Sequence, residues 1–153
     1  MNNKLRNLIR LNNNIYRCTQ SYVDKKLEKY NLTIGTYPYL LMLIKKPGIS
    51  QNEASRELNV DKAMSARAIK RLIEFGYVRK EENKEDSRCY KLYITESGEK
   101  ITPEVIKIIN EWVDILLEGN NKDNIEKSIS FLEGILKNAK KYRKNQCERM
   151  SSE

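Results

Sequence analysis

The side chains with the clearest chemical potential are four cations that follow Asp61. They are Lys62, Arg67, Lys70 and Arg71, and no acidic residue lies among them. An α-helix advances about 100° per residue, which places three of these cations on one side of a helix. The other side holds Ser65, Ile69 and Leu72. Guanidinium and ammonium groups on an exposed helix side can bind nucleic-acid phosphates and base edges.

Small side chains near the start of this segment suit a helix that lies deep in a DNA groove. Ala63 and Ala66 leave room for close approach to the floor of a major groove. The predicted contact residues of the segment are Lys62, Ala63, Met64, Ala66, Arg67, Lys70 and Arg71. A cationic stripe by itself is also typical of an ordinary solvated surface. The neighbouring elements therefore decide between the two interpretations.

The preceding residues carry the start signals of two short helices. Ser50-Gln51-Asn52-Glu53 is a capping-box pattern, in which the serine hydroxyl and the glutamate each accept a free backbone N–H. It predicts a helix that ends near Leu58. Asp61 predicts the start of the next helix. That helix should end at Phe75-Gly76, because glycine readily adopts the left-handed conformation that follows a helix.

The residues after this helix favour a β-hairpin. Residues 77–80 and 88–94 are rich in β-forming side chains, and the polar stretch 81–87 between them predicts the hairpin tip. Asp86 and Arg88 lie two residues apart, so the carboxylate can hold the guanidinium extended toward the negative potential of a narrow minor groove. Helix, turn, helix and hairpin in this order predict a winged helix-turn-helix at residues 50–95.

Residues 60–95 also resemble a known family. Their sequence is VDKAMSARAIKRLIEFGYVRKEENKEDSRCYKLYIT, which is similar to the recognition helix and wing of the multiple-antibiotic-resistance-regulator (MarR) family. The matching elements are Asp61, Arg67, Arg71-Leu72, Gly76, Asp86, Arg88, Leu92-Tyr93-Ile94-Thr95 and Gly98. The sequence departs from the family at Ala63 and Met64, where Thr or Ser is frequent. It also departs at Ser65, where an apolar residue is usual.

The resemblance implies a homodimer whose long first and last helices interdigitate and which binds a pseudo-palindromic site on duplex DNA. It implies phosphate contacts from Ser50 and Gln51, base contacts from residues 62–67, and insertion of Arg88 into the minor groove. It further implies a pocket for a small-molecule effector between the dimerisation helices and the winged module. The candidate lining residues are Tyr16, Tyr37, Tyr39 and Trp112, although aromatic residues at helical spacing more often belong to the core.

Helical periodicity covers most of the remaining chain. Apolar residues recur at helical spacing over residues 4–30, and Thr33 predicts the start of a second helix that stops before Pro47-Gly48. Thr95 predicts the start of a further long helix. A last amphipathic helix covers residues 125–139 and is followed by a basic, polar end that we expect to fray. The predicted class is therefore mainly α with a small β-hairpin wing.

The chain reads as a single domain of residues 1–153, because it has no linker-like stretch and no repeat. Within it, residues 33–98 form the predicted winged module, and residues 1–31 and 99–144 form the predicted helical dimerisation region. The apolar stripes outside the module exceed what the module can cover, so we expect a second copy to bury the remainder. The first 49 residues carry nine Lys/Arg and two Asp/Glu, which can add unspecific phosphate attraction or form a solvated surface.

Composition argues against several other classes. The chain has no histidine and three irregularly spaced cysteines, so we expect no metal site, no disulfide framework and no cofactor. The resemblance makes Cys18 the candidate oxidant sensor, ahead of Cys89 and Cys147, with an incidental thiol as the alternative. The longest apolar run is far shorter than the ~20 residues of a membrane span. The N-terminal segment does not predict a secretory signal, and a cytoplasmic protein is expected.

Together these observations predict a sequence-specific regulator of transcription that binds duplex DNA, acts as a ligand-responsive repressor and is not an enzyme. The alternative from another class is a winged module that mediates protein–protein contacts and binds no nucleic acid. The cationic segment after Asp61 favours DNA. Binding to DNA should weaken steeply as the salt concentration rises.

Overall fold

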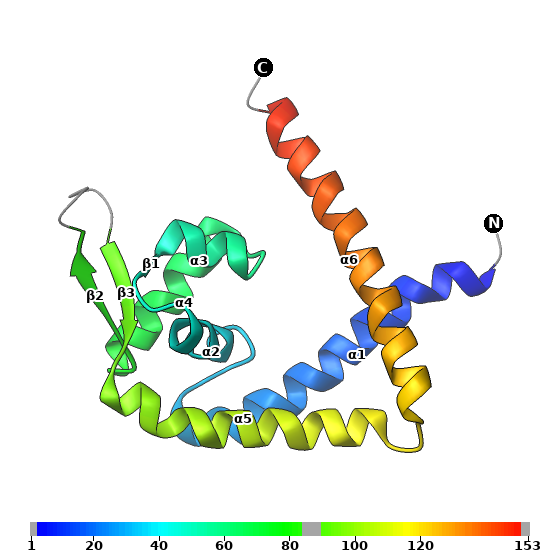
Figure 1. Cartoon of the computed structure of the whole chain (residues 1–153), viewed down its shortest axis with the longest axis horizontal. Helices are drawn as coiled ribbons and strands as arrows, with labels where there is room; N and C mark the ends of the chain where they lie inside the picture. Colours follow the sequence, from blue (N-terminus) through cyan, green and yellow to red (C-terminus); the bar gives the residue numbers. More distant parts are fainter. Residues whose placement is uncertain (1–2, 84–89, 151–153) are drawn as a thin grey trace. The chain divides into compact units, whose positions relative to one another are not determined.

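The computed structural model of the chain describes residues 3–83 and 90–150. Figure 1 shows its elements, which are in chain order α1 (Asn3–Leu27), the short 3₁₀ helix η1 (Glu28–Tyr30), α2 (Tyr37–Lys45), β1 (Ile49–Ser50), α3 (Gln51–Glu57), α4 (Lys62–Glu74), β2 (Val78–Glu82), β3 (Tyr90–Ile94), α5 (Glu96–Leu117) and α6 (Lys122–Met150). Long helices and one small sheet confirm the predicted class. Residues 1–113 and 114–153 form two compact units.

The sheet contains one strand more than the predicted hairpin. Its order is β1-β3-β2 with antiparallel pairing throughout. In β1, Ile49 pairs with Leu92 and Ser50 with Lys91, and the Gly48 N–H donates to the Leu92 carbonyl at 2.8 Å. A strand of two residues has no detectable alternation in the sequence, so its formation depends on the partner strand. The strands β2 and β3, which we call the wing, lie beside α3 and α4 in Figure 1.

The start of α2 corrects the prediction that Thr33 caps this helix. Thr33 and Thr36 instead form a turn, in which the Thr36 N–H donates to the Thr33 carbonyl at 3.0 Å and the Thr33 N–H donates to Thr36 Oγ1 at 2.8 Å. The helix therefore begins four residues after Thr33, at Tyr37, with Pro38 in its first turn. Proline is tolerated there because the first N–H groups of a helix have no partner within the helix.

The start of α5 is fixed against the base of the wing. The Thr95 hydroxyl accepts the Gly98 N–H at 3.1 Å and donates to the Gly76 carbonyl at 2.6 Å, which confirms the predicted cap. A Cβ added at Gly98 would lie 2.4 Å from the Tyr77 carbonyl oxygen. A larger residue would thus force α5 away from the chain that leads into β2. The helix continues through Pro103 to Leu117.

The core of the winged module is formed by buried apolar side chains from several helices and strands. They include Leu40, Leu43, Ala54, Ile69, Leu72, Val78 and Leu92, together with Val23 and Leu27 of α1 and Val105 of α5. The second half of α1 and the middle of α5 are therefore packed against the module within one chain. Burial of this apolar surface holds α4 and the wing in fixed positions.

The unit of residues 114–153 begins with the last turn of α5. Gly119 has a φ of +77° and ends that helix, and Asn121 Oδ1 accepts the Asn124 N–H at 2.9 Å to cap α6. The helix extends through the basic segment to Met150, beyond the predicted 125–139. Its apolar residues Ile129, Phe131, Leu132 and Leu136 are exposed. None of the helices in the described part of the chain combines the length and the apolar character of a membrane span.

Candidate nucleic-acid interface

The predicted capping box at the start of α3 is confirmed. Ser50 Oγ accepts the Glu53 N–H at 3.2 Å, and Glu53 Oε2 accepts the Ser50 N–H at 2.9 Å. The Ser50 hydroxyl also donates to this carboxylate at 2.6 Å. These hydrogen bonds, first from the hydroxyl and then from the backbone, lower the pKa of Glu53. Ser50 and Gln51 are half-buried, and a phosphate that approached the Ser50 hydroxyl would compete with Glu53.

The turn between α3 and α4 is also determined by local hydrogen bonds. Asn59 adopts a left-handed conformation with a φ of 55°, and the Val60 N–H donates to the Ser55 carbonyl at 2.9 Å. Asp61 Oδ1 accepts the Met64 N–H at 2.8 Å, as predicted for the residue that caps α4. This turn sets the direction in which α4 leaves α3, and so the direction in which the α4 side chains project.

The two sides of α4 are separated as the sequence predicts. Ser65, Ile69 and Leu72 are buried, and Leu72 is completely inaccessible. Gly76 ends the helix with a φ of +73°. The apolar side of α4 is thus used entirely for packing, and only the opposite side is available to a partner.

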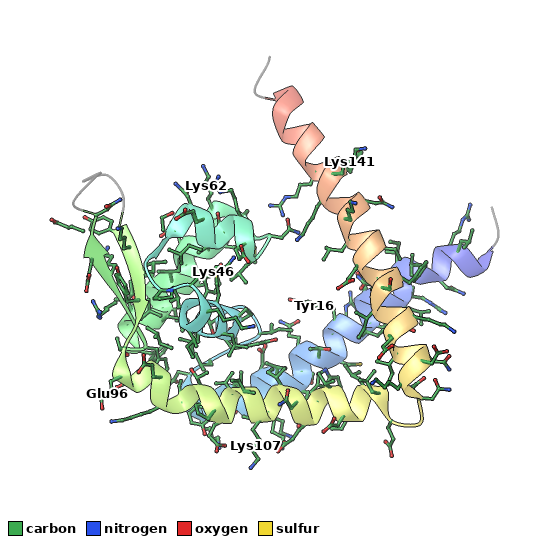
Figure 2. The ribbon with its side chains drawn as sticks, viewed as in Figure 1. Tyr16, Lys46, Lys62, Glu96, Lys107 and Lys141 are labelled. Carbon is green, nitrogen blue, oxygen red and sulfur yellow. The ribbon has the colours of Figure 1, made fainter. Side chains whose placement is uncertain are left out.

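The opposite side of α4, which we call its cationic side, is open to solvent. Its four cations, Lys62, Arg67, Lys70 and Arg71, are exposed. Figure 2 shows Lys62 at the outer surface of the module. Lys70 Nζ lies 3.9 Å from Glu74 Oε1, whereas Lys62 and Arg67 have no carboxylate at ion-pair distance within residues 3–83 and 90–150. Ala63 and Met64 are exposed beside them, and Ala66 is half-buried.

The hydroxyl groups of Tyr39 and Ser65 lie near each other on the buried side of α4. Tyr39 of α2 and Ser65 of α4 are almost completely buried, and neither hydroxyl has a hydrogen bond of normal geometry to any described residue. Burial raises the pKa of Tyr39, the nearby Ser65 hydroxyl opposes this, and the charge of Asp61 adds to it. Ser65 therefore occupies a buried position on α4, opposite another hydroxyl group. Tyr39, a candidate effector residue, belongs to the core here.

The other candidate effector residues lie in different surroundings. Trp112 stacks on Tyr22 of α1 with 4.7 Å between ring centroids, and its Nε1–H donates to Thr19 Oγ1 at 2.9 Å. Tyr37 is half-buried and Tyr16 is exposed; Figure 2 shows Tyr16 on α1. Trp112 therefore connects α5 to α1, whereas Tyr39 lies behind α4. The predicted effector pocket stays a prediction.

Four of the predicted residues lie wholly or partly outside the described part of the chain. Asp86, Arg88 and Cys89 lie outside the described residues, and so does the side chain of Cys147. Cys18 is exposed on α1, and its role as an oxidant sensor stays a prediction. Within the described residues, no group of three Cys, Asp or Glu side chains is placed to hold a metal ion.

One cation at this surface was missed in the sequence. Lys80 of β2 lines a cavity of about 570 Å³ between α4 and the wing, and its Nζ lies 4.7 Å from the centroid of the Tyr90 ring. The signal that could have identified it is strand periodicity. Lys80 follows the buried Val78 by two residues, so both side chains lie on the same side of the sheet.

The comparisons with known proteins agree with this geometry. A family model described as the MarR family matches residues 30–88. The chain is 37% identical to the HTH-type transcriptional regulator BilQ of Clostridioides difficile (strain CD3) over 99 aligned residues. The aligned residues cover 65% of this chain and 67% of that relative. This relative is named as a transcriptional regulator, the class of protein that the sequence predicts.

Solved structures extend the likeness to most of the chain. A MarR transcriptional regulator from Methanosarcina mazei Go1 has a TM-score of 0.81 and 34% identity, covering 88% of this chain and 96% of that one. A mutant MarR from E. coli complexed with operator DNA has a TM-score of 0.79 at 20% identity, with coverage of 88% and 96%. The second likeness concerns the fold alone.

Proposed function

The chain belongs to the MarR family of DNA-binding transcriptional regulators, and from this membership we propose that it is a cytoplasmic, homodimeric repressor that binds a pseudo-palindromic operator and is released by a small-molecule effector. The observation that carries the proposal is the separation of the two sides of α4. Its apolar side is buried, whereas its four cations are open to solvent. A helix with this separation can enter a major groove without exposing core residues.

In this proposal, α4 reads base edges from the major groove and the wing reaches an adjacent minor groove. Arg67 is the principal base-reading residue, because arginine can bind guanine in a bidentate manner. Ser50 and Gln51 contact phosphate, and Asp86 holds Arg88 toward the minor groove. A protein with a similar fold has been solved in complex with operator DNA, which supports binding to duplex DNA but not these particular contacts.

Exposed apolar residues on the long helices support the homodimer. They are Leu5, Ile9, Leu11 and Ile15 on α1, Ile106, Val113, Ile115 and Leu116 on α5, and Ile129, Phe131, Leu132 and Leu136 on α6. So many exposed apolar side chains mark an interaction surface rather than an ordinary one. A two-fold dimer presents two copies of α4, which suits an operator with two half-sites about 34–36 Å apart.

The test begins with selection of bound duplexes from genomic DNA, followed by binding measurements on the selected operator and on random duplex. Arg67→Ala should weaken operator binding by about 1–3 kcal/mol and random binding by less. Lys107→Ala is the matched control. Lys107 is an exposed cation on α5, and Figure 2 shows it on the opposite side of the unit of residues 1–113 from Lys62.

Two outcomes would contradict the proposal at different levels. Equal loss of operator and random binding in Arg67→Ala would show that Arg67 contacts only phosphate, so base reading by this residue would be wrong. Wild-type protein that selects no duplex, and whose binding does not weaken as salt rises, would overturn DNA binding altogether. That result would favour a winged module that binds proteins.

A further inference from the structure

The groove between α4 and the wing contains one cation, Lys80, that the proposed contacts do not use. It is lined at its start by Ser50 and Gln51, on one wall by Ala66, Ile69, Lys70, Ile73 and Glu74 of α4, and on the other by Lys80, Tyr90 and Leu92 of the wing. Ile69 and Leu92 are buried and form its floor. Both walls therefore rise from a packed apolar base, and each wall bears one ammonium group.

The two ammonium groups differ in their surroundings. Lys70 forms an ion pair with Glu74, with 3.9 Å between Lys70 Nζ and Glu74 Oε1. Lys80 has no carboxylate at ion-pair distance in the described part of the chain, and its Nζ lies 4.7 Å from the centroid of the Tyr90 ring. A cation–π contact leaves the ammonium group without an anionic partner, because an aromatic ring carries no net charge. Lys80 is thus the cation of the groove that is best suited to bind an anion.

The strand pairing fixes the direction of Lys80. Lys80 pairs with Leu92 and Val78 with Ile94, and the buried Leu92 and Val78 mark the side of the sheet that faces the core and α4. Lys91 lies next to Leu92 in the strand, so its side chain lies on the other side of the sheet. The wing thereby offers two lysines on opposite sides.

We propose that this groove holds one sugar-phosphate strand of the duplex, with Lys80 bound to a phosphate on the wing side. This inference rests on the proposed function, in which α4 enters a major groove and the wing enters the adjacent minor groove. Neighbouring grooves of a duplex are separated by a single backbone strand. Any backbone between α4 and the wing must therefore pass through the groove that Lys80 lines.

The test measures how the affinity for operator and random duplex depends on salt. Lys80→Gln should lower the magnitude of the log–log salt slope by about 0.9, the value expected for the loss of one phosphate contact. The ratio of wild-type affinity to Lys80→Gln affinity should consequently fall roughly three- to fourfold as the salt concentration rises from about 50 to 200 mM. This fall should be the same on operator and on random duplex. Lys80→Arg should keep the wild-type slope, because it keeps the charge. Lys91→Gln removes the same charge from the other side of the wing and should leave the slope unchanged.

Three results would overturn the inference. The first is a wild-type slope in Lys80→Gln, and the second is an equal fall in Lys91→Gln, since a general change in net charge would then explain the loss. The third is a loss of affinity in Lys80→Gln on the operator alone, which would indicate base reading.

In each of these cases the binding of Arg67→Ala would still differ between operator and random duplex, so the proposed function would survive. Failure of the proposed function would instead appear as absence of salt-dependent binding by wild type, which also overturns the inference. Fluorescence of Trp112 verifies that the variants are folded.

Discussion

The helix α4 and the first half of α1 are both amphipathic, but only α4 has its apolar side covered. In α4, Ile69 is 3% exposed and Leu72 0%. In the first half of α1, Leu5 is 67% exposed and Ile9 66%.

The second half of α1 shows that this contrast does not come from the side chains themselves. Val23 and Leu27 follow Leu5 and Ile9 by 18 residues each, which is about five helical turns, so they point in the same direction. Both are 0% exposed. One apolar side thus runs along α1, and the winged module covers only its second half.

The comparison separates two kinds of surface. On α4 the residues left in solvent are mainly cationic, with the small Ala63 and the single Met64 beside them, so this helix needs no second copy to cover an apolar side. On α1 the residues left in solvent continue an apolar side, whose exposure is unfavourable in water. We infer that a second copy covers it.

The largest expected effect is the loss of the covered side of α4. Leu72→Ala should lower the free energy of unfolding by about 2–5 kcal/mol, because it leaves a cavity in a tightly packed core. Met64→Ala on the same helix is the control, since Met64 is 52% exposed and exposed substitutions usually change stability by no more than about 0.5 kcal/mol. Urea denaturation followed by the fluorescence of the only tryptophan, Trp112, measures both. Similar losses in the two variants would break the distinction between the sides of α4.

The uncovered side of α1 should matter to association and not to the fold of the module. Ile9→Glu should raise the dissociation constant of the dimer at least about tenfold, because it places a charge where an apolar side chain is expected to be buried. Asn14→Glu introduces the same charge about 140° away around the helix, on a residue that is exposed. Sedimentation over a range of protein concentrations compares the two. If Ile9→Glu associates as wild type does, the first half of α1 is not part of the interface. The inference that a second copy covers its apolar side would then be wrong.

The features that could be predicted from the sequence depend on short-range interactions. The Ser50 and Asp61 caps involve partners three residues away, and the sides of α4 follow from helical periodicity alone. Gly76 ends α4 for an equally local reason. Each of these predictions requires only the identities of neighbouring residues, and each is confirmed.

The features that were missed depend on residues far apart in the chain. The strand β1 forms because β3, some 40 residues later, provides a partner. Lys80 joins the candidate interface because the wing packs beside α4 and creates a groove. The Thr33 cap was wrong for a different reason. Threonine residues at 33 and 36 compete for the same role, and the turn that they form delays the helix.

The smallest expected effect is the pH dependence of the capping box, which tests whether the geometry of α3 and α4 is set locally. The pKa of Glu53 lies below its ordinary value of 4.5, because the Ser50 hydroxyl and backbone N–H bind the carboxylate. A carboxyl whose pKa is lowered by folding stabilises the fold above its ordinary pKa, and this contribution is lost as the pH falls through the lowered value. Glu53 is exposed, so solvent screening keeps the contribution small.

The urea midpoints of wild type and Glu53→Gln should therefore differ at pH 7 and converge toward pH 3. Ser50→Ala removes the hydroxyl that lowers this pKa most, so it should lose much of the same pH-dependent part. A difference between wild type and Glu53→Gln that stays constant from pH 7 to pH 3 would mean that the charge of Glu53 does not hold the start of α3, and that more distant packing positions this helix.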